Sequence, residues 1–251
     1  MPDIRILLLF DPEHQERLFP VCDLSEGRTF EDPLKLFSLP HYDLYNENEE
    51  GLYGIGGQIN SDTLEKSYKW GIFPWYSYRD SEVPYWYCPR QRFVIFPDKI
   101  HVSHSLRNLL NKGKYHITFN RAFPEVIHNC RMVNGRDNSE GAWLGDEIER
   151  SFIELHGRGL AKSVELWEGE ELVGGFYGFW HKGVFQGDSM FSLRPSASQI
   201  ALILFCRQTR IEGDKIKFID TQFENPTFSR LGGEFISYEL YRKLMDDEDC
   251  D

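Results

Sequence analysis

The sequence predicts an α+β protein in which a smaller domain precedes a larger one. Of the 251 residues, 41% are hydrophobic and 15% aromatic, which is typical of a folded globular chain. In the second half, two β-rich segments flank a short turn, as in an antiparallel hairpin. A helix, a strand and another helix follow them. We therefore divide the chain into domains of residues 1–90 and 91–251.

The first domain is expected to begin with a strand and to continue largely as loops. The apolar run Ile4–Phe10 is too short for a signal sequence, has no cleavage site and is followed by acidic residues, so we interpret it as a strand. A helix over 61–69 should follow, capped by Ser61 and ended by Gly71. The aromatic, proline-rich run 73–86 lacks periodicity, which predicts a loop.

The second domain shows a clearer alternation of strands and helices. Periodicity, caps and turn residues predict a strand at 93–96, a helix at 104–111, a strand at 115–119, and helices at 122–130 and 146–156. Strands are expected next at 163–167, at 172–179 and from Val184. A helix from Ser196 or Ser198 to about 211, a strand at 218–220 and a final helix at 237–245 should follow.

Several functional classes are disfavoured by what the sequence lacks. No stretch approaches the roughly 20 apolar residues of a membrane-spanning helix. The five cysteines are widely spaced and fit no disulfide framework, so a reducing cytoplasm is the simplest location. The common nucleotide-binding, zinc-protease and serine-hydrolase motifs are missing, and His101 and His104 have no evident partner ligand. Neither a metal nor a cofactor is therefore expected.

The charge distribution gives a mixed signal about nucleic acids. A net charge of −12 argues against a general polyanion binder, because nucleic-acid affinity comes largely from basic residues that meet phosphates. Between Arg90 and Arg121, however, seven basic residues stand against one acidic residue, an excess of six. This basic window is a candidate nucleic-acid-facing patch, and a solvated face of mixed charge is the alternative.

Two segments place carboxylates among large apolar residues. Asp188 lies beside a glycine within 185–192, and Asp220 ends an apolar strand with Gln222 two residues further on. Strand alternation would put Asp220 and Gln222 on the same face. A carboxylate in apolar surroundings needs a partner, which suits proton handling or the binding of an ammonium group. A neighbouring amide can position a nucleophile or an oxyanion, and a capping aspartate is the structural alternative.

An ordered set of motifs over roughly residues 51–242 resembles the leucyl/phenylalanyl-tRNA–protein transferase family. The motifs are YKWGIFPWYS at 68–77, WYCPRQR at 86–92, Trp143, LHxxG at 155–159, SVExW at 163–167, LVGGFYG at 172–178, GDSMFS at 187–192 and IDxQ at 219–222. Each motif alone is weak evidence, but their common order is specific to this family.

The resemblance implies both a fold and a reaction. It implies a small N-terminal α/β domain followed by an acetyltransferase-like (GNAT-like) mixed-sheet catalytic domain. It also implies transfer of Leu or Phe, with Met as a further candidate, from Leu-tRNA or Phe-tRNA to the α-amine of proteins with N-terminal Arg or Lys. The product would feed the N-end rule degradation pathway. Neither a cofactor nor a membrane is expected, and nothing in the sequence suggests an obligate oligomer, so we expect a monomer.

The resemblance also assigns residues to roles. Asp220 and Gln222 would orient or activate the attacking α-amine, and Asp188 would also be catalytic. The ester of aminoacyl-tRNA is already activated, so a positioned amine, proton removal and a stabilised oxyanion would suffice. The 3′-terminal adenosine would stack on aromatic side chains, a contact that holds a base without reading sequence. These are Trp75, Trp143 and Tyr68. The side-chain pocket would contain Phe176, Phe185, Gly187, Met190, Leu202, Phe205 and Ile219, and Asn225 would lie near the acceptor peptide.

The chain departs from the family pattern at several positions. The family usually has Glu at Asp188, Lys at Gln199, His at Thr227, His at Lys162 and Tyr at Phe152. The changes at Asp188, Gln199 and Thr227 bear on amino-acid preference and tRNA binding, and they leave open a non-catalytic protein that binds aminoacyl-tRNA or basic N-termini. An acyl-CoA-dependent acyltransferase is disfavoured, because the turn at 193–198 has no glycine to cradle a pyrophosphate.

Overall fold

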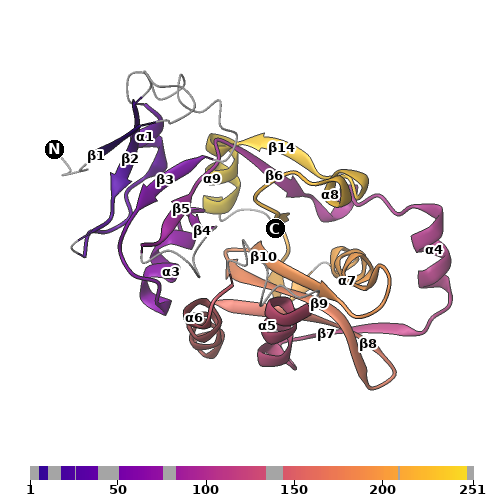
Figure 1. The fold of residues 1–251 in the computed structure, drawn as a ribbon. Coiled ribbons are helices and arrows are strands. Elements are labelled where there is room, and N and C mark those ends of the chain that lie inside the picture. The colour runs from indigo at the N-terminus through magenta and orange to yellow at the C-terminus, as the bar shows by residue number, and fades with distance from the viewer. Residues whose placement is uncertain are drawn as a thin grey trace. The chain divides into compact units, whose positions relative to one another are not determined.

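The chain forms two compact units (Figure 1). The computed structural model describes residues 6–10, 18–25, 27–38, 51–75, 83–133, 144–208 and 210–247. The first unit comprises residues 1–90 and 140–151, and the second comprises 91–139 and 152–251. The sequence alone assigns 140–151 to the second domain, whereas its contacts group it with the first unit.

A five-stranded mixed sheet is the frame of the first unit. Its strand order is β1-β2-β3-β5-β4, and β2 and β3 are its parallel neighbours. The elements are β1 (Ile6–Phe10), β2 (Leu18–Asp23), α1 (Pro33–Phe37), β3 (Leu52–Ile55), α3 (Ser61–Tyr68), β4 (Phe73–Pro74) and β5 (Tyr85–Tyr87). The run 73–86 was expected to be a loop, but it contributes β4 and β5, which are too short to show alternation.

Helix α3 begins with a cap that the sequence places one residue too late. The side chain of Asn60, not that of Ser61, accepts the N–H of Thr63 at 2.9 Å. Thr63 Oγ1 in turn accepts the N–H of Asn60 at 3.0 Å, which completes a capping box. Leu64 and Tyr68, one turn apart on this helix, are completely buried.

A seven-stranded mixed sheet is the frame of the second unit. Its order is β14-β6-β13-β10-β9-β8-β7, with β10 and β13 as its parallel pair. The strands are β6 (Gln91–Ile95), β7 (Tyr115–Phe119), β8 (Ala161–Glu168), β9 (Glu171–His181), β10 (Val184–Ser192), β13 (Phe218–Asp220) and β14 (Glu234–Ser237). The expected hairpin is confirmed as β8 and β9, and the mixed sheet with its helices agrees with an α+β class.

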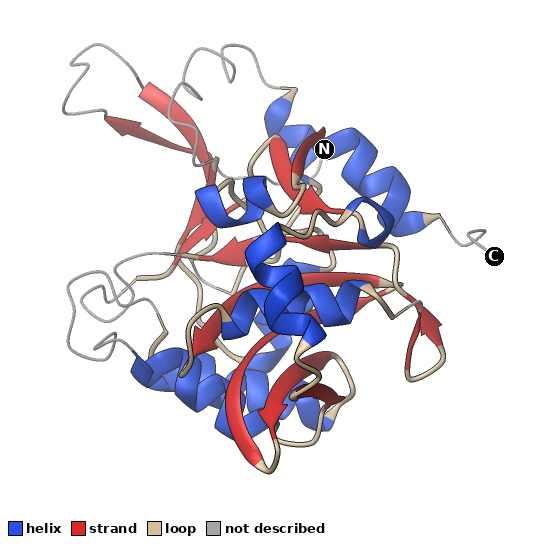
Figure 2. Ribbon diagram, turned by 90° about the vertical axis from the view of Figure 1, so that its right-hand side faces the viewer, coloured by secondary structure: helices blue, strands red, loops and turns tan. Residues whose placement is uncertain are grey.

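Helices cover both faces of this sheet (Figure 2). The described elements are η1 (Pro97–Lys99), α4 (His104–Asn111), α5 (Phe123–Met132), α6 (Asp146–Gly157), α7 (Ala197–Cys206), α8 (Pro226–Arg230) and α9 (Tyr238–Asp246). A two-stranded ribbon of β11 (Arg210–Ile211) and β12 (Asp214–Lys215) follows α7. None of the helices in the described ranges has the length and apolar character needed to span a membrane.

Helix α7 packs on one face of the sheet and α5 on the other. On β8, Val164 belongs to the apolar cluster that contains α7, whereas its neighbour Glu165 contacts the start of α5. Gly174 on β9 allows the close approach of α7, because an added Cβ would lie 2.6 Å from the Cβ of Ala197. Helix α7 ends at Cys206, earlier than the expected 211, because the chain then turns into the β11–β12 ribbon.

Candidate active site

The two predicted carboxylates, Asp188 and Asp220, lie where the parallel strands β10 and β13 part. The pairing of these strands runs as far as Gln186 and Asp220 and ends there. Directly beyond, the register of β10 with β9 shifts between Gly187 and Ser189, so that Asp188 is the extra residue of a β-bulge. A bulge redirects the side chain it carries, and it often marks a functional edge of a sheet.

Gln222 lies in a tight turn that follows β13, not within the strand. The N–H of Phe223 donates to Thr221 O at 2.7 Å, and Gln222 at the centre of the turn has φ +66°. A three-residue turn of this form is rare and strained. The expectation that strand alternation aligns Gln222 with Asp220 was therefore wrong, because β13 ends at Asp220.

Hydrogen bonds nevertheless join the three predicted catalytic residues. The N–H of Gln222 donates to Asp220 Oδ1 at 2.8 Å. The side-chain amide of Gln222 donates to Asp188 Oδ1 at 3.3 Å. Asp220 is completely buried, Gln222 nearly so, and Asp188 is partly exposed. We refer to Asp188, Asp220 and Gln222 as the polar group.

Asp220 pairs with a cation that sequence reasoning did not single out. Arg92 on β6 donates through Nη2 to Asp220 Oδ2, and both side chains are 0% exposed. The guanidinium lies over the ring of Tyr241 on α9, with Cζ 4.9 Å from the ring centroid. Two signals could have found it: Arg92 ends the motif at 86–92, and a buried carboxylate requires a partner.

The residues assigned to the amino-acid pocket gather on the face of the sheet that α7 covers. The rings of Phe176, Phe185 and Phe205 pack edge to face, with centroid separations of 5.2, 5.6 and 5.3 Å. Across the strand pairs, Ile219 lies opposite Phe185 and Met190 lies opposite Phe176. Leu202 belongs to the same cluster, and Gly187 lies on β10 opposite Gly178. We refer to these residues as the aromatic cluster.

Asn225 has a local structural task at the start of α8. Its Oδ1 accepts the N–H groups of Thr227 and Phe228, each at 2.9 Å. This N-cap satisfies two backbone donors that the first turn of a helix leaves without intrahelical partners. The carbonyl of the Asn225 side chain is thus engaged within the protein.

The aromatic residues assigned to adenosine differ in exposure. Trp75 follows β4 in the first unit, is partly exposed and packs edge to face on Tyr87, with centroids 5.6 Å apart. Tyr68 is 0% exposed at the end of α3, which suits a core residue of this unit. Trp143 lies outside the described residues.

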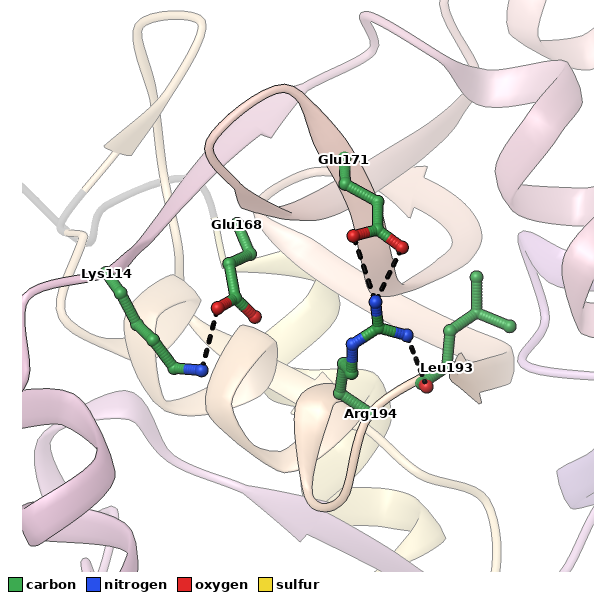
Figure 3. Close-up of polar contacts among 5 residues, drawn as sticks. All are labelled: Lys114, Glu168, Glu171, Leu193 and Arg194. Atoms are coloured by element: carbon green, nitrogen blue, oxygen red, sulfur yellow. Dashed lines mark hydrogen bonds and ion pairs between the residues drawn. The ribbon is translucent and has the colours of Figure 1, made fainter.

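Much of the positive charge in the basic window is engaged within the protein. Arg92 is buried against Asp220, and Lys99 pairs with Glu234. Lys114 pairs with Glu168 at 2.8 Å, at the end of the β8–β9 hairpin (Figure 3). Beside it, Arg194 contacts both carboxylate oxygens of Glu171. Such exposed pairs contribute little stability, but they reduce the charge available to a phosphate backbone.

Two departures from the family pattern lie at well-packed positions. Lys162 on β8 is 7% exposed, pairs with Glu212 and lies over the ring of Trp180. The hydrogen bond from Lys162 holds the pKa of the Glu212 carboxyl below its ordinary value. Phe152 on α6 is completely buried and packs edge to face on Tyr177, with centroids 5.0 Å apart.

Two of the buried cysteines have raised thiol pKa values. Burial raises the pKa of the Cys206 thiol to about 12 and that of Cys22 to about 11, which keeps both protonated near neutral pH. Within the described ranges, no three His, Cys, Asp or Glu side chains come together in a way that could hold a metal ion.

The polar group adjoins the aromatic cluster along β10 and β13, and Phe176, Phe185 and Phe205 are at most 3% exposed. Comparisons with known proteins identify the class of protein. Residues 94–246 match the family described as leucyl/phenylalanyl-tRNA protein transferase, and residues 57–90 match its N-terminal domain. The chain belongs to this family, which confirms the resemblance found in the sequence, and the protein is an aminoacyltransferase.

Three relatives, each a leucyl/phenylalanyl-tRNA–protein transferase, illustrate the similarity. The protein from Flavobacterium johnsoniae is 38% identical over 79% of this chain and 91% of its own length. That from Syntrophus aciditrophicus is 39% identical over 90% of this chain and 88% of its own. That from Pseudomonas aeruginosa is 36% identical over 86% of this chain and 96% of its own.

Proposed function

We propose that the protein transfers leucine or phenylalanine, with methionine as a further candidate, from tRNA to the α-amine of proteins that begin with arginine or lysine. Family membership supports aminoacyl-tRNA as donor and a protein N-terminus as acceptor. The choice of Leu or Phe as the transferred residue is supported by the adjacency of the polar group and the aromatic cluster. Ile219 of the cluster precedes Asp220, and Gly187 precedes Asp188.

In the proposed reaction, the aromatic cluster holds the side chain of the donor amino acid. Three edge-to-face phenylalanine rings favour a large apolar group, and burial of such a group supplies binding energy in proportion to its area. The ester carbonyl of the aminoacyl-tRNA would then lie beside Asp188 and Gln222. The partly exposed Met190, at the edge of the cluster, would adjust the space for Leu, Phe or Met.

The polar group would guide the attacking amine. The side-chain oxygen of Gln222 accepts a hydrogen bond from the α-amine while its nitrogen donates to Asp188. The amine attacks the ester carbonyl, a C–N bond forms, and the C–O bond to the 3′ oxygen breaks. Asp188, the partly exposed carboxylate, accepts the proton that the amine loses and returns it to that oxygen. Asp220 remains buried and orients Gln222.

The remaining roles rest on the resemblance. Trp75, Trp143 and Tyr68 would form the site for the terminal adenosine, in which the two tryptophans stack on the base. Asn225 would lie near the acceptor peptide. The second unit would be of the acetyltransferase-like (GNAT-like) type, which the parting of a parallel pair within an otherwise antiparallel sheet supports. The reaction would feed the N-end rule pathway in the cytoplasm, where aminoacyl-tRNA is found, with the protein acting as a monomer.

Transfer of radiolabelled phenylalanine from Phe-tRNA to a peptide with N-terminal arginine tests the proposal directly. We expect label in the peptide, and less label in a matched peptide that begins with glutamate. The departures at Asp188, Gln199 and Thr227 motivate a second candidate, a protein that binds aminoacyl-tRNA without catalysis. Retention of Phe-tRNA on the protein with no label in either peptide would favour this second candidate and overturn the first.

Replacement of Trp75 by alanine tests the proposed adenosine contact. We expect the KM for Phe-tRNA to rise by roughly tenfold, since stacking on an aromatic side chain contributes about 1–3 kcal/mol per base. The Trp75→Phe variant should keep most of the affinity, because it retains a ring. An unchanged KM in Trp75→Ala would remove this residue from the donor site.

A further inference from the structure

Arg92, the second residue of strand β6, is a fully buried cation. Arginine is seldom completely buried unless it is paired, and here both Arg92 and its partner Asp220 are 0% exposed. Arg92 lies on β6 opposite Ile236 of β14, and its guanidinium packs on the ring of Tyr241. The main chain of Arg92 is therefore held by pairing with β14, and its guanidinium lies against the Tyr241 ring of helix α9.

Asp220 links Arg92 to Gln222 through its two carboxylate oxygens. One carboxylate oxygen accepts from Arg92, and the other accepts the N–H of Gln222 at 2.8 Å. An aspartate that bonds the backbone two residues ahead stabilises a turn, and here the turn contains Gln222 at φ +66°. Residues other than Gly, Asn and Asp seldom adopt this conformation, so the surrounding bonds must hold it in place.

The backbone of the same strand β6 holds the turn from a second direction. Phe93, the neighbour of Arg92, donates its N–H to Gln222 O at 3.4 Å. Its carbonyl accepts both the N–H of Thr221 at 3.0 Å and the Thr221 hydroxyl at 2.9 Å. Two consecutive residues of β6 thus fix the turn, one through its side chain and one through its main chain.

We propose that Arg92 is a positioning residue for the transfer reaction. Through Asp220 it sets the conformation of Gln222, and hence the direction in which the Gln222 amide meets Asp188 and the acceptor amine. This inference rests on the proposed function and extends it to a residue outside the polar group. A planar guanidinium suits the task, because its donors have a fixed geometry that a lysine ammonium lacks.

Stability alone is a weak reason for such a pair. Burial of two charges carries a desolvation cost, and hydrophobic residues of similar volume often serve equally well or better. An apolar pair at 92 and 220 would fill the space but would supply neither the acceptor for the Gln222 N–H nor the orientation of that acceptor. The link to a strained turn at a partly exposed carboxylate is what distinguishes Arg92 from a packing residue.

Kinetics of four variants test the proposal: Arg92→Lys, Tyr241→Leu, Gln222→Ala and the double variant Arg92→Lys with Gln222→Ala. Arg92→Lys keeps the charge, and we expect kcat to fall roughly hundredfold, as for a slight misplacement of reacting groups, with an unchanged KM for Phe-tRNA. In the Gln222→Ala background the same change should have no further effect, because Arg92 acts through Gln222. Effects that multiply, or a fully active Arg92→Lys, would overturn the proposal.

Tyr241→Leu and a control variant, Lys162→Met, separate positioning from folding. Tyr241→Leu loosens the guanidinium while both charges remain, so we expect a smaller loss of kcat that also disappears in the Gln222→Ala background. This variant carries the test if Arg92→Lys fails to fold. Lys162→Met is the matched control, since it removes another buried cation that packs on an aromatic ring. It should lower thermal stability with kcat unchanged, and an equal loss of kcat would indicate a general structural effect.

A measurement without activity distinguishes this proposal from the proposed function. In protein labelled with ¹⁵N-glutamine, the signals of Gln222 are identified by their loss in Gln222→Ala. Arg92→Lys should shift the backbone and side-chain signals of Gln222, whereas Lys162→Met should leave them unchanged. If the wild type transfers no label, the proposed function fails, but these shifts still test the positioning link. Unmoved Gln222 signals in Arg92→Lys would overturn the inference even in an active enzyme.

Discussion

Asp220 and Glu165 are both completely buried carboxylates of the seven-stranded sheet, yet their surroundings differ. Glu165 accepts hydrogen bonds from the hydroxyls of Thr118 and Ser163 and from the N–H of Ala122. Asp220 pairs with a guanidinium and holds a strained turn whose side chain reaches the partly exposed Asp188.

The difference separates a scaffold from a candidate active site. The hydrogen bonds of Glu165 connect β7, β8 and the start of α5. Trp167 adds to this network, because its indole N–H donates to Thr118 Oγ1 at 2.8 Å. Those of Asp220 lead from the interior towards the surface. Burial of a carboxylate therefore says little about function by itself, and the path of its hydrogen bonds says more.

Loss of the Asp220 carboxylate is the change expected to have the largest effect. In Asp220→Ala the buried Arg92 loses this partner, and breaking a buried ion pair in this way typically costs about 3–5 kcal/mol. We expect a drop of that size in the free energy of unfolding, measured by urea denaturation, together with loss of transfer. A drop below about 1 kcal/mol would mean that Arg92 and Asp220 are not coupled as described.

The Asp188→Asn variant separates catalysis from stability. Asparagine keeps the shape and an acceptor for Gln222, but it takes up no proton. We expect kcat to fall by about 10²-fold or more, and the free energy of unfolding to change by less than about 0.5 kcal/mol, because asparagine keeps the volume and the acceptor for the Gln222 amide. Near-normal kcat would assign the proton acceptor to another group and weaken the contrast with Glu165.

Glu165→Gln should show the opposite pattern. The amide nitrogen of glutamine would face donors that now meet a carboxylate, which leaves a buried polar group poorly satisfied. We expect the free energy of unfolding to fall by about 1–3 kcal/mol while kcat in the transfer assay stays at the wild-type value. A selective loss of kcat without loss of stability would place Glu165 with Asp220 rather than with the scaffold.

Glu212 is a half-exposed carboxylate, and loss of its ion pair with Lys162 should have the smallest effect on stability. Its pKa is lowered from 4.5 chiefly by the hydrogen bond from Lys162. The stabilisation is therefore fully present above pH 4.5 and is lost as the pH falls through the lower folded value. Acid titration of stability should be flatter in Lys162→Met than in the wild type. Identical slopes in that range would show that the pair makes no such contribution.

Local patterns allowed much of the second unit to be predicted from sequence. The β8–β9 hairpin, α4, β7 and β13 follow the expected residues closely, because short-range periodicity and turn residues define them. The short elements β14 and α8 and the β11–β12 ribbon were missed, since two to five residues cannot establish a period.

The contacts within the candidate site could not be predicted from the sequence. The resemblance named Asp188, Asp220 and Gln222, whose functional roles stay proposals, and the contacts among them come from the structure. Arg92 was missed because it lies 128 residues from its partner in the chain. The positive φ of Gln222 was missed for a different reason. Glutamine gives no local signal for that conformation, which tertiary bonds impose.

The bulge at Asp188 has a consequence for the register of strand β10. Simple alternation would bring Phe185, Gly187 and Ser189 to one face of the sheet. With one extra residue, Met190 instead of Ser189 lies opposite Phe176, on the face of the aromatic cluster. Loss of the bulge at unchanged chain length would therefore place the hydroxyl of Ser189 opposite Phe176 and turn the flexible apolar side chain of Met190 to the other face. One unpaired residue thus decides which side chain this strand presents to the cluster.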